Sequence, residues 1–103
     1  MDAPIASLKL VEVGPGGTRR EIQVEVGCPR PDGRGAWACA IRIDGFDSWP
    51  RDIYGEDSLQ ALCLGLHLVR TELEGVLERG SRLVHADDDS EFQLTAYFEG
   101  FLD

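Results

Sequence analysis

Cys63 and His67 are the residues of this sequence whose types and spacing come closest to metal or acid–base chemistry. They are four residues apart, so a helix would present them on one face. A thiolate and an imidazole are zinc ligands, and together they can also act as nucleophile and base. A zinc site would need Cys28 or Cys39 as well, but ten residues separate these two and no Cys-x-x-Cys pair is present. We therefore expect no metal, cofactor or catalytic site, and Cys63 and His67 are weak metal candidates.

The three cysteines also bear on the compartment. Cys28, Cys39 and Cys63 cannot all pair within one chain, and each lies inside an apolar pattern. Buried free thiols in a reducing cytosol explain this with the fewest assumptions. The N-terminal residues lack the basic and apolar stretches of a signal peptide, and no apolar run is long enough to cross a bilayer. We expect a cytoplasmic protein that does not bind membranes.

Carboxylates gather near the C-terminus, where Asp87, Asp88, Asp89 and Glu91 stand close together. Such clusters suit divalent cations, but the alternating ligand spacing of a calcium loop is missing, as is the glycine at its turn. A solvated acidic loop that caps the next segment is the simpler interpretation. These four residues remain candidates for an interaction with another protein.

Gln60 is a further interaction candidate. It follows Asp57 by three residues, which is the spacing of a helix capping box. Capping and packing explain the pair without any ligand. In the alternative, an exposed Gln60 and the backbone of Gly55 form part of a groove at the helix N-terminus, where anions are favoured.

The charge balance is strongly acidic. Ten basic residues against nineteen acidic residues give a formal net charge of −9, which would repel nucleic acid and anionic lipids. Residues 81–103 carry one basic and six acidic side chains, whereas the first 35 residues are neutral overall. One hypothesis is that the acidic tail folds back onto a basic patch near the loops, made of Arg19, Arg20, Arg30 and Arg34.

Alternating apolar and polar residues predict the sheet. Strands are expected over 5–13, 21–26, 36–43 and 50–54, and turn residues separate them. One polar face along 21–26 is typical of an antiparallel strand with one side in water. The alanines at 36, 38 and 40 indicate that something packs closely there, either a partner chain or the C-terminal segment. The opposite, apolar face of the sheet is expected to consist of Ile22, Val24, Val26, Trp37, Cys39, Ile41 and Ile43.

A single long helix is expected over 57–80. Leucines and valines recur at three- and four-residue spacing, Asp57 is a suitable N-cap and Gly80 a suitable stop. Ala61 and Gly65 form a smooth stripe that favours close packing on the sheet over packing on a second helix. In the C-terminal segment, 81–103, the pattern over 91–102 fits a helix and a strand equally well.

Two motifs resemble those of an uncharacterised family of short bacterial proteins that carry a domain of unknown function. The first is Trp37-Ala38-Cys39, with Ile41 and Gly45. The second, more specific, runs from Gly55 to Leu64 and contains the string Asp57-Ser58-Leu59-Gln60-Ala61-Leu62. The resemblance covers about residues 5–85. It implies a β-rich half followed by one long helix, and it implies no activity.

The sequence therefore predicts one α+β domain over residues 1–103: an antiparallel sheet of about four strands, one long helix and a short acidic and aromatic C-terminal segment. The expected function is a non-enzymatic binding or adaptor protein, in one version an immunity-type or inhibitor protein whose acidic surface covers a basic partner. The alternative is a small metal- or thiol-dependent enzyme that uses Cys63 and His67. A monomer, and a homodimer through the alanine face or an edge strand, both remain open.

Overall fold

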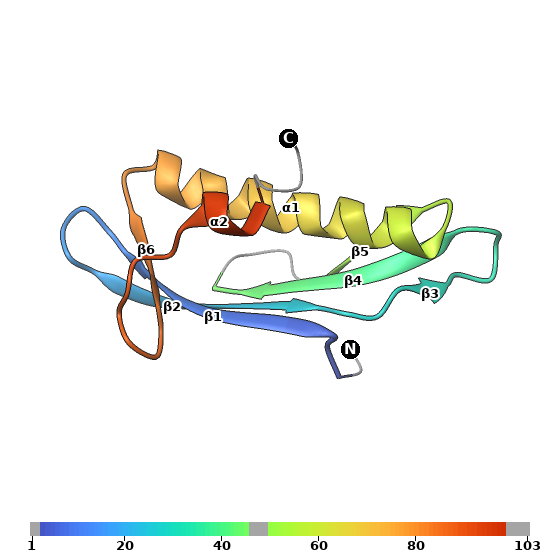
Figure 1. Ribbon diagram of the computed structural model, residues 1–103, viewed down its shortest axis with the longest axis horizontal. Coiled ribbons are helices and arrows are strands. Elements are labelled where there is room, and N and C mark those ends of the chain that lie inside the picture. Colours follow the sequence, from blue (N-terminus) through green and yellow to red (C-terminus); the bar gives the residue numbers. More distant parts are fainter. Residues whose placement is uncertain (1–2, 46–49, 99–103) are drawn as a thin grey trace.

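The protein is an antiparallel sheet with one long helix lying along one of its faces. The computed structural model describes residues 3–45 and 50–98 (Figure 1). This α+β architecture confirms the expectation from the sequence. In chain order the elements are β1 (Ala6–Val13), β2 (Arg19–Val26), β3 (Arg30–Pro31), β4 (Trp37–Asp44), β5 (Arg51–Gly55), α1 (Ser58–Glu78), β6 (Arg82–His85) and α2 (Leu94–Phe98).

The sheet contains six strands within the described residues, two more than the expected four. Its order is β3-β4-β2-β1-β6, and β5 pairs with the other side of β4. β3 is two residues long and β6 four, so neither is long enough to show a clear alternation. β3 continues the line of β2 along β4 after Cys28 and Pro29, where the strand has one residue more than its partner.

The core lies between α1 and the inner face of the sheet, as expected. α1 contributes small and branched residues at three- and four-residue spacing, among them Gly65. A Cβ atom on Gly65 would lie 2.9 Å from Cδ1 of Ile41, so the smooth stripe of the helix packs on the sheet. The fully or nearly buried members of this core include Leu10, Ile22, Val24, Val26, Cys39, Ile41, Ile43, Ala61, Val69, Leu73 and Val76.

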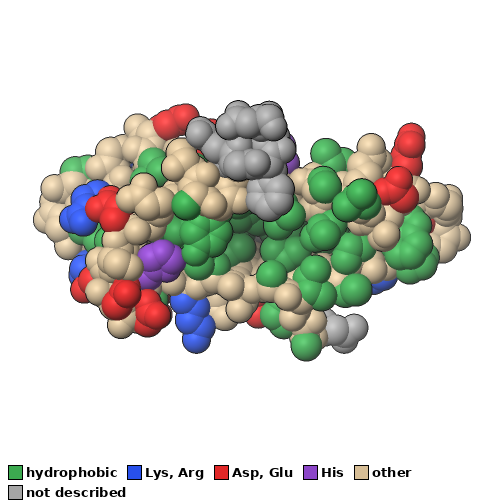
Figure 2. Space-filling view, in the orientation of Figure 1, with side chains coloured by type: hydrophobic (Ala, Val, Ile, Leu, Met, Phe, Trp, Pro, Cys, Tyr) green, Lys and Arg blue, Asp and Glu red, His purple; other side chains and the backbone are tan. Residues whose placement is uncertain are grey.

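The outer face of the sheet has no helix over it in the described residues (Figure 1). Ile22, Val24 and Val26 are buried on the inner side, so Glu21 and Glu25 on the same strand point outwards. In the view of Figure 2, apolar side chains gather between α1 and the strands, and charged side chains lie mostly around them. The inner face of the sheet is thus apolar and covered by α1, whereas the outer face carries charged side chains and has no helix over it in the described residues.

The C-terminal segment returns to the sheet and then forms a short helix. Glu91 makes a single antiparallel bridge to Val84 of β6, and the buried Phe92 packs edge-on against His85 at 5.7 Å. α2 follows from Leu94 to Phe98, so the segment 91–102, for which sequence patterns left helix and strand open, begins with a bridge at Glu91 and continues as a helix over 94–98. Residues 99–102 of that segment lie outside the described residues.

Candidate binding surface

Cys63 and His67 lie exposed on α1, and the described residues place no third metal ligand beside them. Cys63 was expected to be a core residue, but it is exposed, because it lies on the side of the helix away from the sheet. No group of three or more potential metal ligands occurs among residues 3–45 and 50–98. Cys63 and His67 therefore lie near each other on one helix face, and the described residues add no further metal ligand or catalytic group to the pair.

The other two cysteines occupy opposite environments. Cys28 is exposed, which corrects the expectation that all three thiols are buried. Cys39 is fully buried under Gly65, and its thiol donates to the carbonyl oxygen of Gly27 at 3.4 Å. Burial raises the pKa of Cys39, so this thiol stays protonated and unreactive at neutral pH.

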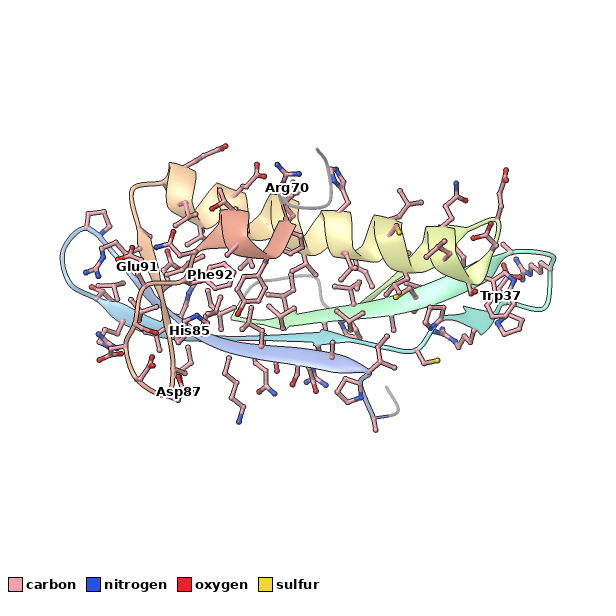
Figure 3. All side chains as sticks on the ribbon, viewed as in Figure 1. Trp37, Arg70, His85, Asp87, Glu91 and Phe92 are labelled. Carbon is pink, nitrogen blue, oxygen red and sulfur yellow. The ribbon has the colours of Figure 1, made fainter. Side chains whose placement is uncertain are left out.

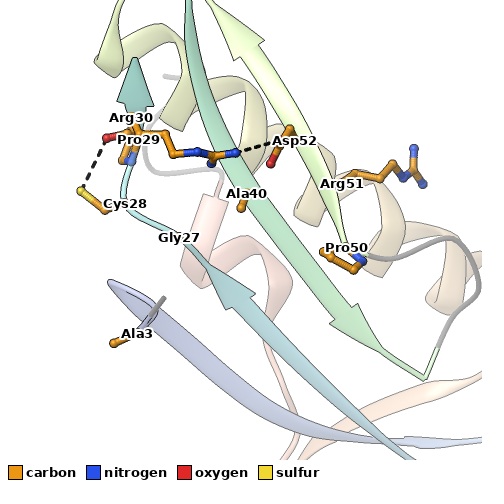
Figure 4. Close-up of a pocket in the computed structure, with 9 residues that line it drawn as sticks. All are labelled: Ala3, Gly27, Cys28, Pro29, Arg30, Ala40, Pro50, Arg51 and Asp52. Atoms are coloured by element: carbon orange, nitrogen blue, oxygen red, sulfur yellow. Dashed lines mark hydrogen bonds and ion pairs between the residues drawn. The ribbon is translucent and has the colours of Figure 1, made fainter. Parts of the chain in front are cut away.

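A hollow of about 600 Å³ opens on the outer face where β3 and β5 flank β4 (Figure 4). Arg30 extends across β4 and donates to a carboxylate oxygen of Asp52 at 2.8 Å. Ala40 lies opposite Asp52 in the ladder, and Ala38 lies opposite Arg30. The small alanine side chains leave room for the arginine to cross. The C-terminal segment was one of the two expected covers of the alanine face, but its described helix α2 packs beside α1 on the other side of the sheet.

A tight acidic turn joins β6 to Glu91. The N–H of His85 donates to the carbonyl of Ser90, and Asp89 adopts a left-handed conformation at φ 58°. Asp88 accepts hydrogen bonds from both the hydroxyl and the backbone N–H of Ser90, which together lower the pKa of Asp88. Asp88 therefore holds the turn, whereas Asp87 projects below the sheet on the side opposite α1 (Figure 3).

The described part of the acidic tail, up to residue 98, forms an ion pair with Arg19, one of the four arginines that were expected to receive it. Arg19 pairs with Asp89 at 2.6 Å, and within the tail itself Arg82 pairs with Glu91 at 3.3 Å. Arg20 pairs instead with Glu12 of the neighbouring strand, and Arg30 crosses to Asp52. In the described residues, the fold-back consists of a contact of Arg19 with the acidic turn.

Gln60 serves to cap α1. Asp57 accepts the backbone N–H of Gln60 at 2.7 Å, and the side-chain oxygen of Gln60 accepts the N–H of Glu56 at 2.6 Å. Asp57 thus satisfies an N–H group that the first helical turn leaves without a partner, and Gln60 binds the residue just before the N-cap. The capping interpretation of this pair is therefore confirmed, and the oxygen of Gln60 is already engaged.

Most of the positive charge is neutralised inside the chain. All ten basic residues lie within the described ranges, and seven of them form ion pairs with seven different carboxylates. Three further carboxylates accept backbone N–H groups in turns or at the helix cap, namely those of Asp32, Asp57 and Asp88. In the described part of the chain, the carboxylates with neither role are Glu21, Glu25, Glu56, Glu78 and Asp87.

Glu21, Glu25 and Asp87 belong to one side of the molecule. Both glutamates face outwards from β2, and Asp87 projects on the same side from the turn after β6. A smaller hollow of about 340 Å³ beside Glu21 is also lined by Lys9, Asp44 and Ala86, among others. We call Glu21, Glu25 and Asp87 the outer carboxylates. Of these, sequence reasoning singled out Asp87 alone, although the alternation of β2 already placed the two glutamates on one face.

The architecture is that of an open antiparallel sheet with one long helix across one face. A model of the family described as a domain of unknown function (DUF6968) matches residues 9–96, and the chain belongs to this family. The match extends beyond the expected limit near residue 85 and includes the acidic turn. No curated protein and no solved structure matches the chain. Within the described residues, none of the helices combines the length and apolarity needed to span a bilayer.

Proposed function

We propose that this protein is a non-enzymatic cytoplasmic binding protein whose outer carboxylates take a basic surface of a partner protein. One observation carries the proposal: internal ion pairs engage seven of the ten basic side chains, while Glu21, Glu25 and Asp87 form no ion pair in the described residues. Arg42 lies opposite Glu25 and Lys9 lies near Glu21 on the same face, but the net charge of −9 keeps the field around the protein negative. Such a field accelerates association with a positively charged protein and repels nucleic acid.

An immunity-type or inhibitor protein is the specific version of this function that we favour. A carboxylate-bearing sheet face can cover a basic active or nucleic-acid-binding surface, because the potentials of the two surfaces are complementary. No chemistry by the protein itself is required. Glu21 and Glu25 alternate along β2 and so lie on one pleated face, which presents them at a fixed spacing.

Affinity capture with a matched charge control tests the proposal. The outer variant, Glu21→Gln with Asp87→Asn, and the control, Glu56→Gln with Glu78→Gln, each remove two negative charges without breaking an ion pair in the described residues. We expect a basic protein to be retained by the wild type and the control at about 50 mM salt, and to be lost at about 500 mM salt. The outer variant should retain at least about tenfold less. Equal losses in the two variants, or capture that ignores salt, would contradict the proposal.

The alternative function, a metal- or thiol-dependent enzyme, needs activated side chains at Cys63 and His67. Both are exposed on one face of α1, so a reagent can reach them. Alkylation of Cys63 much faster than that of Cys28, abolished by His67→Ala, would favour this alternative, as would about one equivalent of bound metal in the purified protein. Equal rates at the two exposed thiols and no metal would end it.

A further inference from the structure

One half of β1 forms an open edge of the sheet. β1 pairs with β2 along its whole length, from Ala6 to Val13. On its other side β6 pairs with Leu10 to Val13 and stops there. The described residues place no strand beside Ala6–Leu8 on that side, so β6 leaves a strand-wide place vacant along the first half of β1.

The backbone of Ser7 points into this place. Alternate residues of an antiparallel strand direct their N–H and C=O groups to the same edge. The carbonyl of Lys9 accepts the N–H of Ala86 at 3.2 Å on the β6 side. The N–H and C=O of Ser7, two residues earlier, therefore face the same edge, where the described chain offers them no partner.

This edge lacks the features that normally protect one. Exposed edges usually carry charged residues or proline, which prevent pairing with other chains. β5, at the far side of the sheet, follows Pro50 and carries Arg51 and Asp52. Pro4 and Lys9 flank the open edge, but residues 5–8 between them are Ile-Ala-Ser-Leu, uncharged and without proline, and Ile5 is 52% exposed.

The charged and apolar side chains around the open edge indicate which kind of strand could bind there. A strand added beside Ala6–Leu8 and antiparallel to β1 would continue the line of β6, with its N-terminal end next to Ala86 and Asp87. A carboxylate at that end favours a cation on the incoming strand. On the other side of the edge, Figure 2 shows apolar side chains between the strands and α1, and the half-buried Leu8 packs against the core.

We propose that the open edge of β1 binds an extended segment of the basic partner, which adds a strand beside Ala6–Leu8 and places a lysine or arginine near Asp87. Alternate apolar side chains of the segment would pack towards Leu8 and α1. This inference rests on the proposed function and extends it by the form of the partner. A second copy of the chain is a poorer occupant, because two copies each carry a net charge of −9 and bring no basic segment to Asp87.

Peptide titration of the full ¹⁵N-labelled chain tests the inference. The probe is an acetylated, amidated hexapeptide, Lys-Lys-Val-Thr-Val-Thr, and the control replaces both lysines with glutamate. We expect amide shifts at Ser7, Leu8, Ala86 and Asp87 with the probe, and affinity at least about tenfold lower for the control. Ser7→Pro removes the outward N–H without touching the ladder to β2, so it should weaken probe binding at least about tenfold.

If Ser7→Pro does not fold, a charge reversal at Asp87 still tests the inference. Asp87→Lys should reverse the preference, binding the glutamate peptide and rejecting the lysine peptide. Equal binding of both peptides, shifts on β5 instead of β1, or a folded Ser7→Pro protein with unchanged affinity would overturn the inference. So would a dimer in sedimentation whose Ser7 amide is protected from exchange. If captured partner is lost by the outer variant but not by Ser7→Pro, the proposed function stands and the added strand does not.

Discussion

The two faces of this sheet use the same strands for opposite purposes. On the inner face, side chains such as Ile22 and Ile41 are at most 1% exposed and pack against α1. On the outer face, the intervening residues of the same strands carry carboxylates and arginines in water. Period-two alternation makes this division possible, because neighbouring residues of a strand point to opposite sides.

The inner face accounts for the stability of the fold, and the outer face is the one available for binding. Apolar burial on the inner face supplies most of the folding free energy, whereas exposed ion pairs on the outer face contribute little. Charges on the outer face can therefore change with small effects on folding, which leaves that face available for binding. If the two functions divide in this way, substitutions on the inner face should change stability strongly, and substitutions on the outer face should change it little.

Neighbouring residues of β2 provide the sharpest contrast. Ile22→Ala should lower the free energy of unfolding by roughly 2–5 kcal/mol, because it removes buried methyl groups and leaves a cavity in the core. Gln23→Ala, one residue on and on the outer face, should change it by less than about 0.5 kcal/mol. Urea unfolding of both variants measures the difference. Similar losses at the two positions would show that the outer face is also part of the folding core.

Alanine substitutions at two glycines of α1 distinguish the effect of close packing on the sheet from the effect of helix propensity. Alanine at either Gly65 or Gly75 gains about 1 kcal/mol of helix propensity. At Gly65 the new Cβ would lie 2.9 Å from Ile41, whereas at Gly75 the nearest atom is the Arg79 guanidinium at 3.7 Å. We expect Gly75→Ala to be the more stable variant by about 1–3 kcal/mol in thermal or urea unfolding. Equal stabilities would mean that α1 stands further from the sheet than described.

Glu12 is a charged residue on the inner side of β1, and it should make stability depend on pH. Burial alone would raise the pKa of Glu12, but hydrogen bonds with Ser81 and Arg20 outweigh burial and lower it below 4.5. The folded state therefore favours the ionised carboxylate. Its contribution is fully present above the unfolded pKa and is lost as the pH falls through the folded pKa.

Glu12→Gln isolates this contribution. Near neutral pH the variant should be less stable than the wild type by about 1 kcal/mol, because a charge-assisted hydrogen bond to Ser81 at 2.7 Å is weakened. The difference should shrink as the pH falls below 4.5. Urea unfolding across this range measures it. A difference that stays constant with pH would assign the effect of the substitution to packing rather than to ionisation.

The inner face was largely predictable from the sequence, since period-two and three- to four-residue patterns report burial directly. The patterns placed Ile22, Ile41 and Gly65 correctly. They failed for Cys63, which has leucines on both sides, because neighbours in sequence lie about 100° apart on a helix and do not share its buried face. A short strand at 83–85 was one interpretation of the sequence, and β6 confirms it, but its pairing with the distant β1 could not be predicted from local patterns. β3 lies in a segment that was expected to be a loop, because two residues beside prolines give no alternation.

The outer face was predictable in composition but not in arrangement. Net charge indicated an acidic surface, yet which carboxylates are paired depends on strand register. Arg30 reaches Asp52 because β3 and β5 flank β4, and no spacing in the sequence connects these two residues. The open edge of β1 likewise follows from where β6 stops. Its one sequence signal is the uncharged run at residues 5–8.

The ion pair across β4 should show the smallest effect. Arg30 and Asp52 are 2.8 Å apart, but their side chains are 52% and 35% exposed, so water and salt screen them. A double-mutant cycle with Arg30→Ala and Asp52→Ala should give a coupling below about 1 kcal/mol, and it should decrease at high salt. A larger, salt-independent coupling would show that this part of the outer face helps to hold the sheet together, and stability and recognition would then not divide between the two faces.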